Sequence, residues 1–564
     1  MLPRITLSII CLKRDPGATL FFSMNLDSDF SGRRAILDLL KKRVLDLKDG
    51  YRQNVALLGG RHVGKTAILR HFLFNLDEEN VTPVYLDLEN KDFPFILRKF
   101  IGSLLYNYSK NKQLPLHQDV PLLIETTKKL IPHTVQVIGE IYKNFQSRKL
   151  TTCFLGLLAL PEIFTNETGH ACVLVLDEFQ GLEALAIPNA FQHLGKKIMT
   201  QKKCLYIVSS SYPRAAEEIF SEKLSLLFGN FEILHVDAFD LEMSRQFIHA
   251  KLRNIRMGEA LRHFLIDFTA GYPLYLSLLC EELAILSAVH KQDEIFVPVL
   301  TQAVENTLFH PWGVIGRHFE LIVSELSLAK GRRLMQSLLI SLANDKYRIA
   351  EICDDLGLAK NHVTPKLNRL VEEGIILKNG NYHYFKDKLF RYWIKYVFQQ
   401  RLRSLEIDPG SQGRQFKEEF NRLVESFKVS SRKDVSSRIV ELLNCFDNEA
   451  FNLNGRRYKL PIFREIVPLK FKNEQGNYFD VIRASTADNS WFIVLKDENF
   501  GEAEVNTVLA ETRKTGHKPE RCLIISLKDL DENMRLKALQ ERFWIWSEKE
   551  INTLLTLFNK PYII

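Results

Sequence analysis

The stretch that most limits what this chain of 564 residues can fold into is ALLGGRHVGKTAIL, from Ala56 to Leu69. Its glycines, lysine and threonine match the pattern G-x-x-x-x-G-K-[ST]. In that pattern a glycine-rich loop turns its backbone N–H groups around a polyphosphate, the lysine reaches the terminal phosphates and the hydroxyl binds Mg²⁺. The residues expected to bind a nucleotide in this way are Gly59, Gly60, Arg61, His62, Val63, Gly64, Lys65, Thr66 and Ala67.

The sequence on either side of this loop supports the assignment. Asn54 to Leu58 is a short apolar run of the buried-strand type. After the loop, apolar residues recur at helical spacing, namely Ile68, Leu69, Phe72, Leu73 and Leu76. A glycine-rich turn without a ligand is the alternative, but the order strand, loop, helix favours a phosphate-binding loop.

A second motif, ACVLVLDEFQGL, places two carboxylates after an apolar run. Val173 to Leu176 is typical of a central parallel strand, and open α/β sheets bind ligands where such strands end. We expect Asp177 to bind Mg²⁺ together with Thr66, and Glu178 to be the general base that activates water, with Lys65 also catalytic. The alternative is a helix-capping aspartate followed by a solvated glutamate.

Three further apolar runs complete a predicted sheet of about five strands. Cys204 to Val208 reads as a strand that ends in Ser209, Ser210 and Ser211. A small polar side chain there, with Ser209 as the candidate, could contact the γ-phosphate or the attacking water; a plain serine-rich turn explains it equally well. Thr82 to Leu88 and Phe231 to Val236 are the other two runs. Helical stretches separate the strands, so the predicted fold class is α/β, a parallel sheet with helices on both faces.

Composition narrows the class of protein further. A chain of this length suggests three or four domains of about 150 residues, and 46% hydrophobic residues are enough to build their cores. The net charge of +8 permits contact with nucleic acid without demonstrating it. Eight cysteines without a C-x-x-C pair predict a reducing, cytoplasmic location, and no apolar run approaches a membrane span. We expect residues 1–24 to be a poorly ordered extension.

Three motifs together resemble the archaeal-type ATPases of the STAND class, which are relatives of the AAA+ proteins. They are DFSGRRAILDLL with Phe30, Gly32 and Arg33, DEFQ from Asp177 to Gln180, and TAGYPLYLSLL with Gly271 and Pro273. The resemblance implies ATP and Mg²⁺ as cofactors. It also implies that Arg33 and the turn Gly271–Pro273 lie near the base or ribose; without it, Gly271 and Pro273 read only as a turn between helices.

The predicted P-loop domain spans 25–240 and is followed by a helical lid, 241–325, and a winged helix-turn-helix domain, 326–405.

Within the winged helix-turn-helix domain, the sequence pattern predicts helices at Leu334–Ala343, Ile349–Leu356 and Val363–Glu372, then a hairpin around Asn379–Asn381. Pro365 is tolerable only in the first turn of the third helix. The side chains expected to meet double-stranded DNA are Lys360, Asn361, His362, Lys366, Asn368 and Arg369.

Winged helices in this family also serve as lids or partner surfaces, so the DNA and protein alternatives both stay open. The helix after the predicted hairpin, with Asp387, Leu389 and Trp393, matches a family segment that packs on the domain, which implies no chemistry.

DPGSQG, within 406–414, predicts a linker to a last domain, 415–564. The order of strands and helices there resembles restriction-endonuclease-like domains. By that resemblance the metal site would use Asp480, Lys496 and an acid two residues before the lysine, but that position is Val494. Asp497 should point to the opposite strand face, and Glu498 would need a bulge. A valine cannot bind a hard cation, so we expect the domain to be inactive as a nuclease.

Three classes of function therefore compete. One is an ATPase acting as a nucleotide-driven switch on DNA, through the winged helix and the last domain. A second is a nucleotide-gated scaffold that binds a protein partner or itself, without DNA. The third is an ATP-regulated nuclease. The sequence identifies no arginine finger, and Arg214 is its only candidate.

Overall fold

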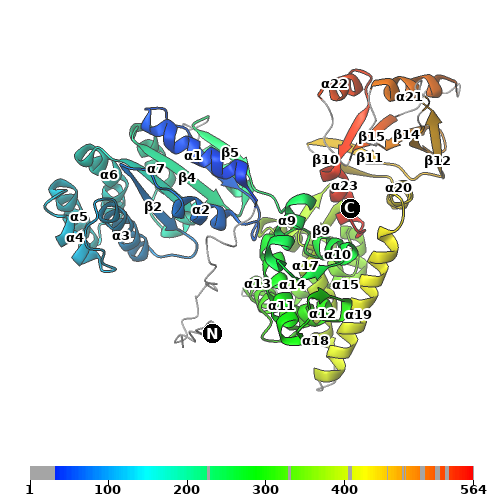
Figure 1. Cartoon of the computed structure of the whole chain (residues 1–564), viewed down its shortest axis with the longest axis horizontal. Helices are drawn as coiled ribbons and strands as arrows, with labels where there is room; N and C mark the ends of the chain where they lie inside the picture. Colours follow the sequence, from blue (N-terminus) through cyan, green and yellow to red (C-terminus); the bar gives the residue numbers. More distant parts are fainter. Residues whose placement is uncertain are drawn as a thin grey trace.

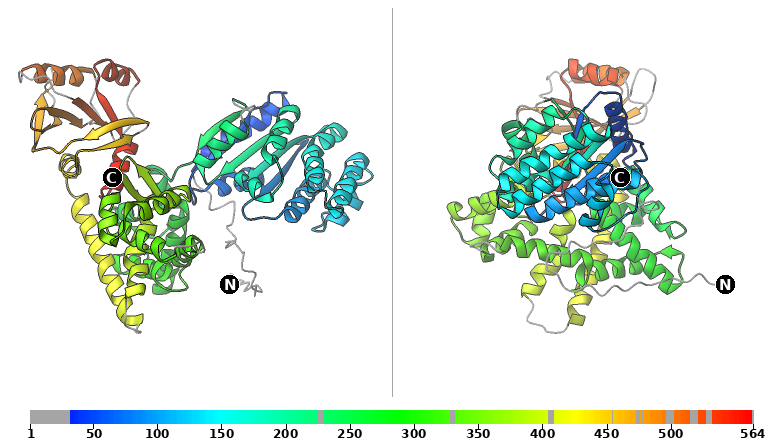
Figure 2. Two further views of the ribbon diagram at one scale, coloured as in Figure 1. Left: turned by 180° about the vertical axis from the view of Figure 1, so that it is seen from behind. Right: turned by 90° about the vertical axis from the view of Figure 1, so that its left-hand side faces the viewer.

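The computed structural model describes residues 32–224, 229–327, 332–403, 409–453, 455–472, 476, 478–495, 502–514, 521–526 and 532–562. Three parts are visible in Figures 1 and 2: a sheet flanked by helices near the N-terminus, a mostly helical middle carrying a small hairpin, and a second sheet near the C-terminus. The predicted extension, residues 1–24, and Phe30 of the resembling motif lie outside the described residues.

The first part is built on a five-stranded sheet in the order β2-β3-β4-β1-β5, in which every pairing is parallel. Its strands are β1 Asn54–Leu58, β2 Val81–Asp87, β3 Ala171–Asp177, β4 Cys204–Ser210 and β5 Phe231–His235. β1 and β4 are buried along their whole length, as expected for strands covered on both faces. Ser209 and Ser210 belong to β4 itself, so this strand is longer than predicted.

Helices cover both faces of this sheet, as the sequence predicts. One face packs with α1 and α2 in one core, and the other packs with α3, α6 and α7 in a second core. Neighbouring residues of one strand point to opposite cores: Leu57 lies in the first and Leu58 in the second. The helical elements are α1 Arg34–Lys48, α2 Lys65–Phe74, α3 Phe93–Asn111, α4 Val120–Thr127, α5 Pro132–Gln146, α6 Leu150–Thr168, the 3₁₀ turn Phe179–Leu185, α7 Ala190–Thr200, α8 Pro213–Glu218 and the π turn Ile219–Lys223.

The next segment, residues 241–327, is here called the helical region. It consists of α9 Leu241–Leu252, α10 Glu259–Thr269, α11 Pro273–His290, α12 Val297–Val304, the π turn Glu305–Phe309 and α13 Val314–Ser327, with two short strands, β6 Arg256–Met257 and β7 Glu294–Ile295. Contrary to the prediction from apolar runs, α11 is long and apolar enough to cross a membrane, and it alone meets that test among the described residues. Half of it is buried in the fold, where it contacts α9 and α12.

Residues 332–403, here called the winged region, follow the predicted order of three helices and a hairpin. The elements are α14 Arg332–Ala343, α15 Ile349–Leu356, α16 Lys360–Glu372, β8 Ile376–Asn379, β9 Tyr382–Phe385, α17 Lys388–Trp393, the π turn Ile394–Phe398 and α18 Gln399–Arg403. α16 starts three residues earlier than expected, so Pro365 lies inside it rather than in its first turn. β8 and β9 pair antiparallel, as a hairpin requires.

The predicted linker at 406–414 is wrong over its described part, because α19 begins at Pro409 and runs to Ser431. Proline is well suited to the first position of a helix, where its missing N–H costs nothing. The apolar face of α19 then joins the core of the helical region, with Phe420 in ring contact with Phe264 and Phe268 of α10. The helix we assigned to the last domain therefore packs on the middle of the molecule.

The C-terminal part is a mixed sheet in the order β12-β13-β14-β15-β16, beside the hairpin β10-β11. The first two pairings of the sheet are antiparallel and the last two parallel. The elements are α20 Val435–Leu443, β10 Glu449–Leu453, β11 Arg456–Leu460, β12 Glu465–Lys472, β13 Tyr478–Ser485, β14 Ser490–Leu495, α21 Glu502–Lys514, β15 Arg521–Ser526, α22 Glu532–Gln540, β16 Trp544–Ser547 and α23 Glu548–Leu557.

The hairpin β8-β9 packs on the C-terminal part. Asn379 Nδ2 donates to the Asn452 carbonyl at 2.7 Å, and Asn452 N donates to Asn379 Oδ1 at 2.7 Å. Tyr382 and Tyr384 of β9 share a buried core with β13 to β16. The tip of the wing is therefore an internal contact of this structure.

Candidate functional site: the P-loop and the carboxyl edge of the first sheet

The loop between β1 and α2 has the backbone that its glycines predict. Gly64 has a φ of 93°, the left-handed region that favours glycine, and α2 starts at the next residue. A Cβ on Gly59 would lie 2.1 Å from the Val236 carbonyl oxygen, so no larger residue fits there. His62 also has a positive φ, 67°, which is costly for a bulky residue and typical of functional loops. The loop is thus a backbone cradle at the start of a helix, a favourable place for an anion.

Lys65 lies buried at the end of this cradle. Its Nζ donates to the carbonyls of Gly59 at 3.1 Å and Gly60 at 2.8 Å, and to Ser211 Oγ at 2.8 Å. Glu178 Oε1 is 3.9 Å away. Burial lowers the pKa of Lys65, while Glu178 and Asp177 raise it. The ammonium therefore stands between the loop and the acidic strand end, as the motif requires.

Asp177 is the centre of a buried hydrogen-bond network at the end of β3. Its Oδ2 accepts from Thr66 Oγ1 at 2.8 Å and from Tyr85 Oη at 2.8 Å, and its Oδ1 accepts from Ser209. Burial and this carboxylate together raise the pKa of Tyr85, so the phenol stays protonated and donates. A hydroxyl and a carboxylate held together in this way are an oxygen donor set that suits Mg²⁺.

Glu178 is held in a strained backbone conformation with a φ of 51°. Its Oε2 accepts from Ser211 N at 2.8 Å and from Gln180 Nε2 at 2.7 Å, and its Oε1 accepts from Ser211 Oγ. The Glu178 N–H in turn donates to Ser209 Oγ at 3.2 Å. The carboxylate that we expect to act as base is thus tied to the end of β4.

The residues expected near the base or ribose also gather beside the loop. The Arg33 guanidinium donates to the Asp237 carbonyl and lies 5.1 Å from the centroid of the Phe239 ring. Phe239 N donates to the Gly271 carbonyl at 2.9 Å. A Cβ on Gly64 would lie 4.0 Å from Pro273 Cγ, so the start of α11 borders the P-loop.

Lys386, at the end of the hairpin β8-β9, was not predicted to belong to the site. A Cβ on Gly60 would lie only 2.6 Å from its Nζ. The next residue, Asp387, is half-buried, accepts from Tyr275 of α11 and caps α17 by accepting from Leu389 N and Phe390 N. The motif that follows the wing predicts a packed helix, but no local pattern places Lys386 over a loop so distant in sequence.

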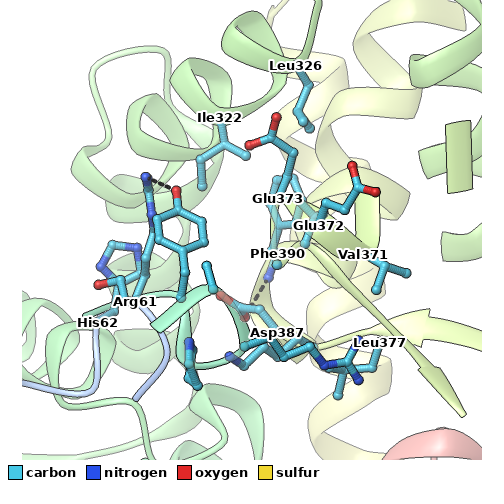
Figure 3. Close-up of a pocket in the computed structure, with 18 of the residues that line it drawn as sticks. Arg61, His62, Ile322, Leu326, Val371, Glu372, Glu373, Leu377, Asp387 and Phe390 are labelled. Atoms are coloured by element: carbon cyan, nitrogen blue, oxygen red, sulfur yellow. Dashed lines mark hydrogen bonds between the residues drawn. The ribbon is translucent and has the colours of Figure 1, made fainter. Parts of the chain in front are cut away.

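A cavity of about 520 Å³ opens between the P-loop, α8, the helical region and the winged region. Figure 3 shows Arg61 and His62 on one side of it and Glu372 and Glu373 on the other. Arg214, the predicted arginine-finger candidate, also lines it and is exposed. Nonpolar side chains such as Ile322 and Phe390 complete its wall.

Two partly buried histidines join the P-loop to α13. His62 Nε2 and His318 Nε2 are 2.9 Å apart, so one ring must donate and the other accept. Burial lowers the pKa of both rings, in His318 to about 4. The neutral pair is thus a direct contact between the P-loop and α13, and His62 also lines the cavity.

The described residues of the C-terminal sheet do not form a metal site. Asp480 lies on β13, is 46% exposed and faces Lys470 at 4.0 Å, while Val494 is fully buried in β14. Lys496, Asp497 and Glu498 lie outside the described residues. Within the described ranges, no three His, Cys, Asp or Glu side chains are grouped so that they could hold a metal ion.

Among the residues expected to meet DNA, Lys360, Asn361, His362 and Asn368 are exposed on α16. Arg369 lies 3.7 Å from Glu373 on the same helix, and Lys366 also has an interaction partner. The polar side of α16 is thus a mixed surface, basic at its start and acidic at its end.

No protein-family model matches this chain, and no curated protein matches it either. Solved structures align with about two thirds of its length, at TM-scores below 0.5. A Walker-type ATPase of Pyrococcus abyssi is 16% identical, with a TM-score of 0.46, over 65% of this chain and 97% of that one. The Aeropyrum pernix ORC1 protein in complex with DNA is 12% identical, with a TM-score of 0.38, over 65% and 92%. The Aeropyrum pernix ORC2 protein is 10% identical, with a TM-score of 0.41, over 67% and 98%.

Proposed function

We propose that this chain binds Mg-ATP in its P-loop, hydrolyses it slowly to ADP and phosphate, and uses the cycle as a STAND-type switch. The observation that carries the proposal is the convergence of four side chains: Lys65 on the loop, Thr66 at the start of α2, and Asp177 and Glu178 at the end of β3. Thr66 and Asp177 are 2.8 Å apart, and Lys65 lies 3.9 Å from Glu178.

The residues present fit this ligand. The glycines of the loop leave a backbone cradle, which a side chain at their positions would fill. The polar groups at the end of this cradle are two carboxylates, a hydroxyl and an ammonium. In the proposed reaction the loop N–H groups and Lys65 hold the phosphates, while Thr66 and Asp177 hold the metal. Bound Mg²⁺ would neutralise charge on the terminal phosphates. Glu178 takes a proton from water, for which it must release Ser211, and Ser209 orients Asp177.

Ligand-induced stabilisation tests the binding step. ATP with Mg²⁺ at a concentration 100-fold above its Kd should stabilise the wild type by about 2.7 kcal/mol. Lys65→Ala should abolish that gain, since it removes the ammonium that faces the phosphates. Lys48→Ala, which removes an exposed cation paired with Glu78, is the matched control and should keep the gain. Equal thermal shifts in wild type and Lys65→Ala would contradict the proposal.

We further propose that the switch acts on double-stranded DNA through the polar side of α16. The supporting observation is the exposed group Lys360, Asn361 and His362, at the helix end that helix-turn-helix proteins direct toward bases. Duplex DNA should raise ATP turnover. Lys360→Ala combined with Arg369→Ala should weaken duplex binding and lower its salt slope by at most about two. Turnover without DNA should stay unchanged, and an unchanged salt slope and affinity in the double variant would contradict this interface.

The packing of the wing favours a second candidate, a nucleotide-gated scaffold for a protein partner or a second copy of the chain. The tip of β8-β9 is covered by β10 rather than open, so DNA could not use it without rearrangement. On this alternative, duplex DNA changes neither turnover nor the thermal shift.

We propose that the C-terminal domain is restriction-endonuclease-like in fold, and we do not expect it to cut DNA. Nicking of DNA with Mn²⁺ that is lost in Asp480→Ala would contradict this expectation.

A further inference from the structure

Arg61 of the P-loop reaches across the edge of the first sheet. Its Nη2 donates to Tyr212 Oη at 2.6 Å and lies 3.4 Å from Glu89 Oε1. Tyr212 follows β4 and Glu89 follows β2, and β3 lies between these two strands. The guanidinium therefore spans the end of β3, where Asp177 and Glu178 lie.

The contacts of Arg61 lead directly to the groups expected to react. Tyr212 is the neighbour of Ser211, whose hydroxyl accepts from Lys65 at 2.8 Å and whose N–H donates to Glu178 at 2.8 Å. Beyond the effect of burial, the positive charge of Arg61 lowers the pKa of Lys65, and the carboxylate of Glu178 raises the pKa of Arg61. A single relay of contacts thus joins Arg61, Lys65 and Glu178.

The present partners of Arg61 are easily exchanged. Its side chain is 39% exposed and that of Glu89 is 43% exposed, so this ion pair is of the weak surface kind. A phosphate offers a guanidinium two charged acceptors in parallel, which is a stronger partner than one tyrosine hydroxyl. The cavity of about 520 Å³ beside Arg61 gives the side chain room to turn.

Arg214 has the same charge and lines the same cavity, but it lacks these connections. Among the described residues, its guanidinium forms no hydrogen bond or ion pair. Beyond the effect of burial, its positive charge lowers the pKa of Lys386 rather than that of Lys65. Arg214 is therefore a useful comparison for Arg61.

We propose that Arg61 is an arginine finger supplied by the P-loop itself, which binds the terminal phosphate and neutralises the charge that develops there during hydrolysis. This inference rests on the proposed ATPase function. In the step concerned, the oxygen of water bonds to the γ-phosphorus, the bond to the β-phosphate oxygen breaks and Glu178 accepts the proton. Arg61 donates hydrogen bonds and takes up no proton.

The test compares Arg61→Ala, Arg61→Lys and the control Arg214→Ala in the full-length protein. ADP binding should stay within about threefold in all three, which also shows that each variant folds. Turnover should fall about a thousandfold in Arg61→Ala and less in Arg61→Lys, which keeps the charge without the planar fork. Trapping of ADP with aluminium fluoride, which mimics the transition state, should be lost in Arg61→Ala alone.

Three results would overturn the assignment. Arg61→Ala could trap ADP and aluminium fluoride and turn over like the wild type. It could lose ADP and ATP affinity equally with unchanged turnover, which would make Arg61 a uniform binder. Trapping could fail in Arg214→Ala instead. None of these three results contradicts the proposed ATPase function itself. That proposal would be contradicted if the wild-type protein did not bind ATP at all.

Discussion

At the scale of single residues, Glu178 combines a strained backbone with a satisfied side chain. Its left-handed φ turns the carboxylate toward Ser211 and Gln180, and both neighbours donate to it. Strain of this kind costs about 1 to 3 kcal/mol and persists only where surrounding contacts enforce it. The bond from Glu178 N to Ser209 Oγ provides such a contact from the neighbouring strand.

Glu178→Gln should preserve ATP binding and lower turnover by about 100-fold or more, because the amide keeps the shape of the side chain but cannot accept a proton. The measurement is phosphate release with and without Mg²⁺, alongside nucleotide titration. Glu183→Gln, the same exchange at an exposed carboxylate on the following 3₁₀ turn, is the control and should leave turnover intact. Wild-type turnover in Glu178→Gln would show that another group is the base.

The pair His62–His318 predicts a dependence of stability on pH. The pKa of each ring is lower in the folded chain than its ordinary value of about 6.5, so below that pH the unfolded chain binds more protons. The contribution of this pair to the free energy of unfolding is therefore fully present above about pH 6.5. It decreases as pH falls toward the folded pKa of His318, which is about 4. His318→Gln should reduce the loss of Tm between these limits, whereas His249→Gln, at an exposed position on α9, should not. Identical Tm profiles in wild type and His318→Gln would contradict this.

At the scale of elements, α19 is a helix whose buried apolar face outweighs the linker-type residues at its start. Pro, Gly and Ser at its start predict a linker, yet Phe416, Phe420, Val424 and Phe427 recur at helical spacing and all are buried. Phe420 is fully buried among aromatic rings from α10 and α17. Burial of this stripe fixes the helix to the middle of the molecule.

Phe420→Ala should destabilise the protein by about 3 to 5 kcal/mol, the range for deleting a buried phenylalanine and leaving a cavity. Denaturant unfolding followed by tryptophan fluorescence measures it. Val429→Ala, on the same helix but 60% exposed, should change stability by no more than about 0.5 kcal/mol. A linker role for this segment would instead predict equally small effects for both substitutions.

At the scale of the whole molecule, the winged region contacts both sheets. Lys386 reaches the P-loop, and at the other end of the hairpin Gly380 meets β10 so closely that a Cβ would lie 2.3 Å from the Ala450 carbonyl oxygen. The C-terminus closes the arrangement: Tyr562 N and Lys388 Nζ both donate to Asp267 of α10, at 2.9 and 3.0 Å. One small hairpin therefore contacts both the P-loop and the C-terminal part of the molecule.

Gly380→Ala tests this contact. Gly380 and Gly374 both have a positive φ, 59° and 71°, so alanine strains the backbone at either position. Only at position 380 would it also clash, because no atom lies within 4 Å at Gly374. Gly380→Ala should thus lower Tm more than Gly374→Ala and expose the junction to limited proteolysis. Equal effects of the two substitutions would show that the close approach to Ala450 is unimportant.

The sequence by itself determined the local features of the site. Strand, loop and helix around Lys65, and the apolar run before Asp177, are set by patterns within about ten residues, which act before any distant contact forms. The alternation of strands and helices likewise predicted the parallel sheet, and parallel strands bring their carboxyl ends to one edge, so Thr66 and Asp177 meet.

Only the tertiary structure decided which distant segments complete that edge. Lys386 and His318 carry no motif, and they reach the P-loop because burial of apolar faces docks the winged and helical regions beside it. Tyr85 of β2 and Ser211 after β4 join the same edge through the order of the strands in the sheet. The same burial made α19 a helix and covered the wing, against the local signals for a linker and a free hairpin. Packing energy is summed over the whole core, and no short stretch of sequence contains that sum.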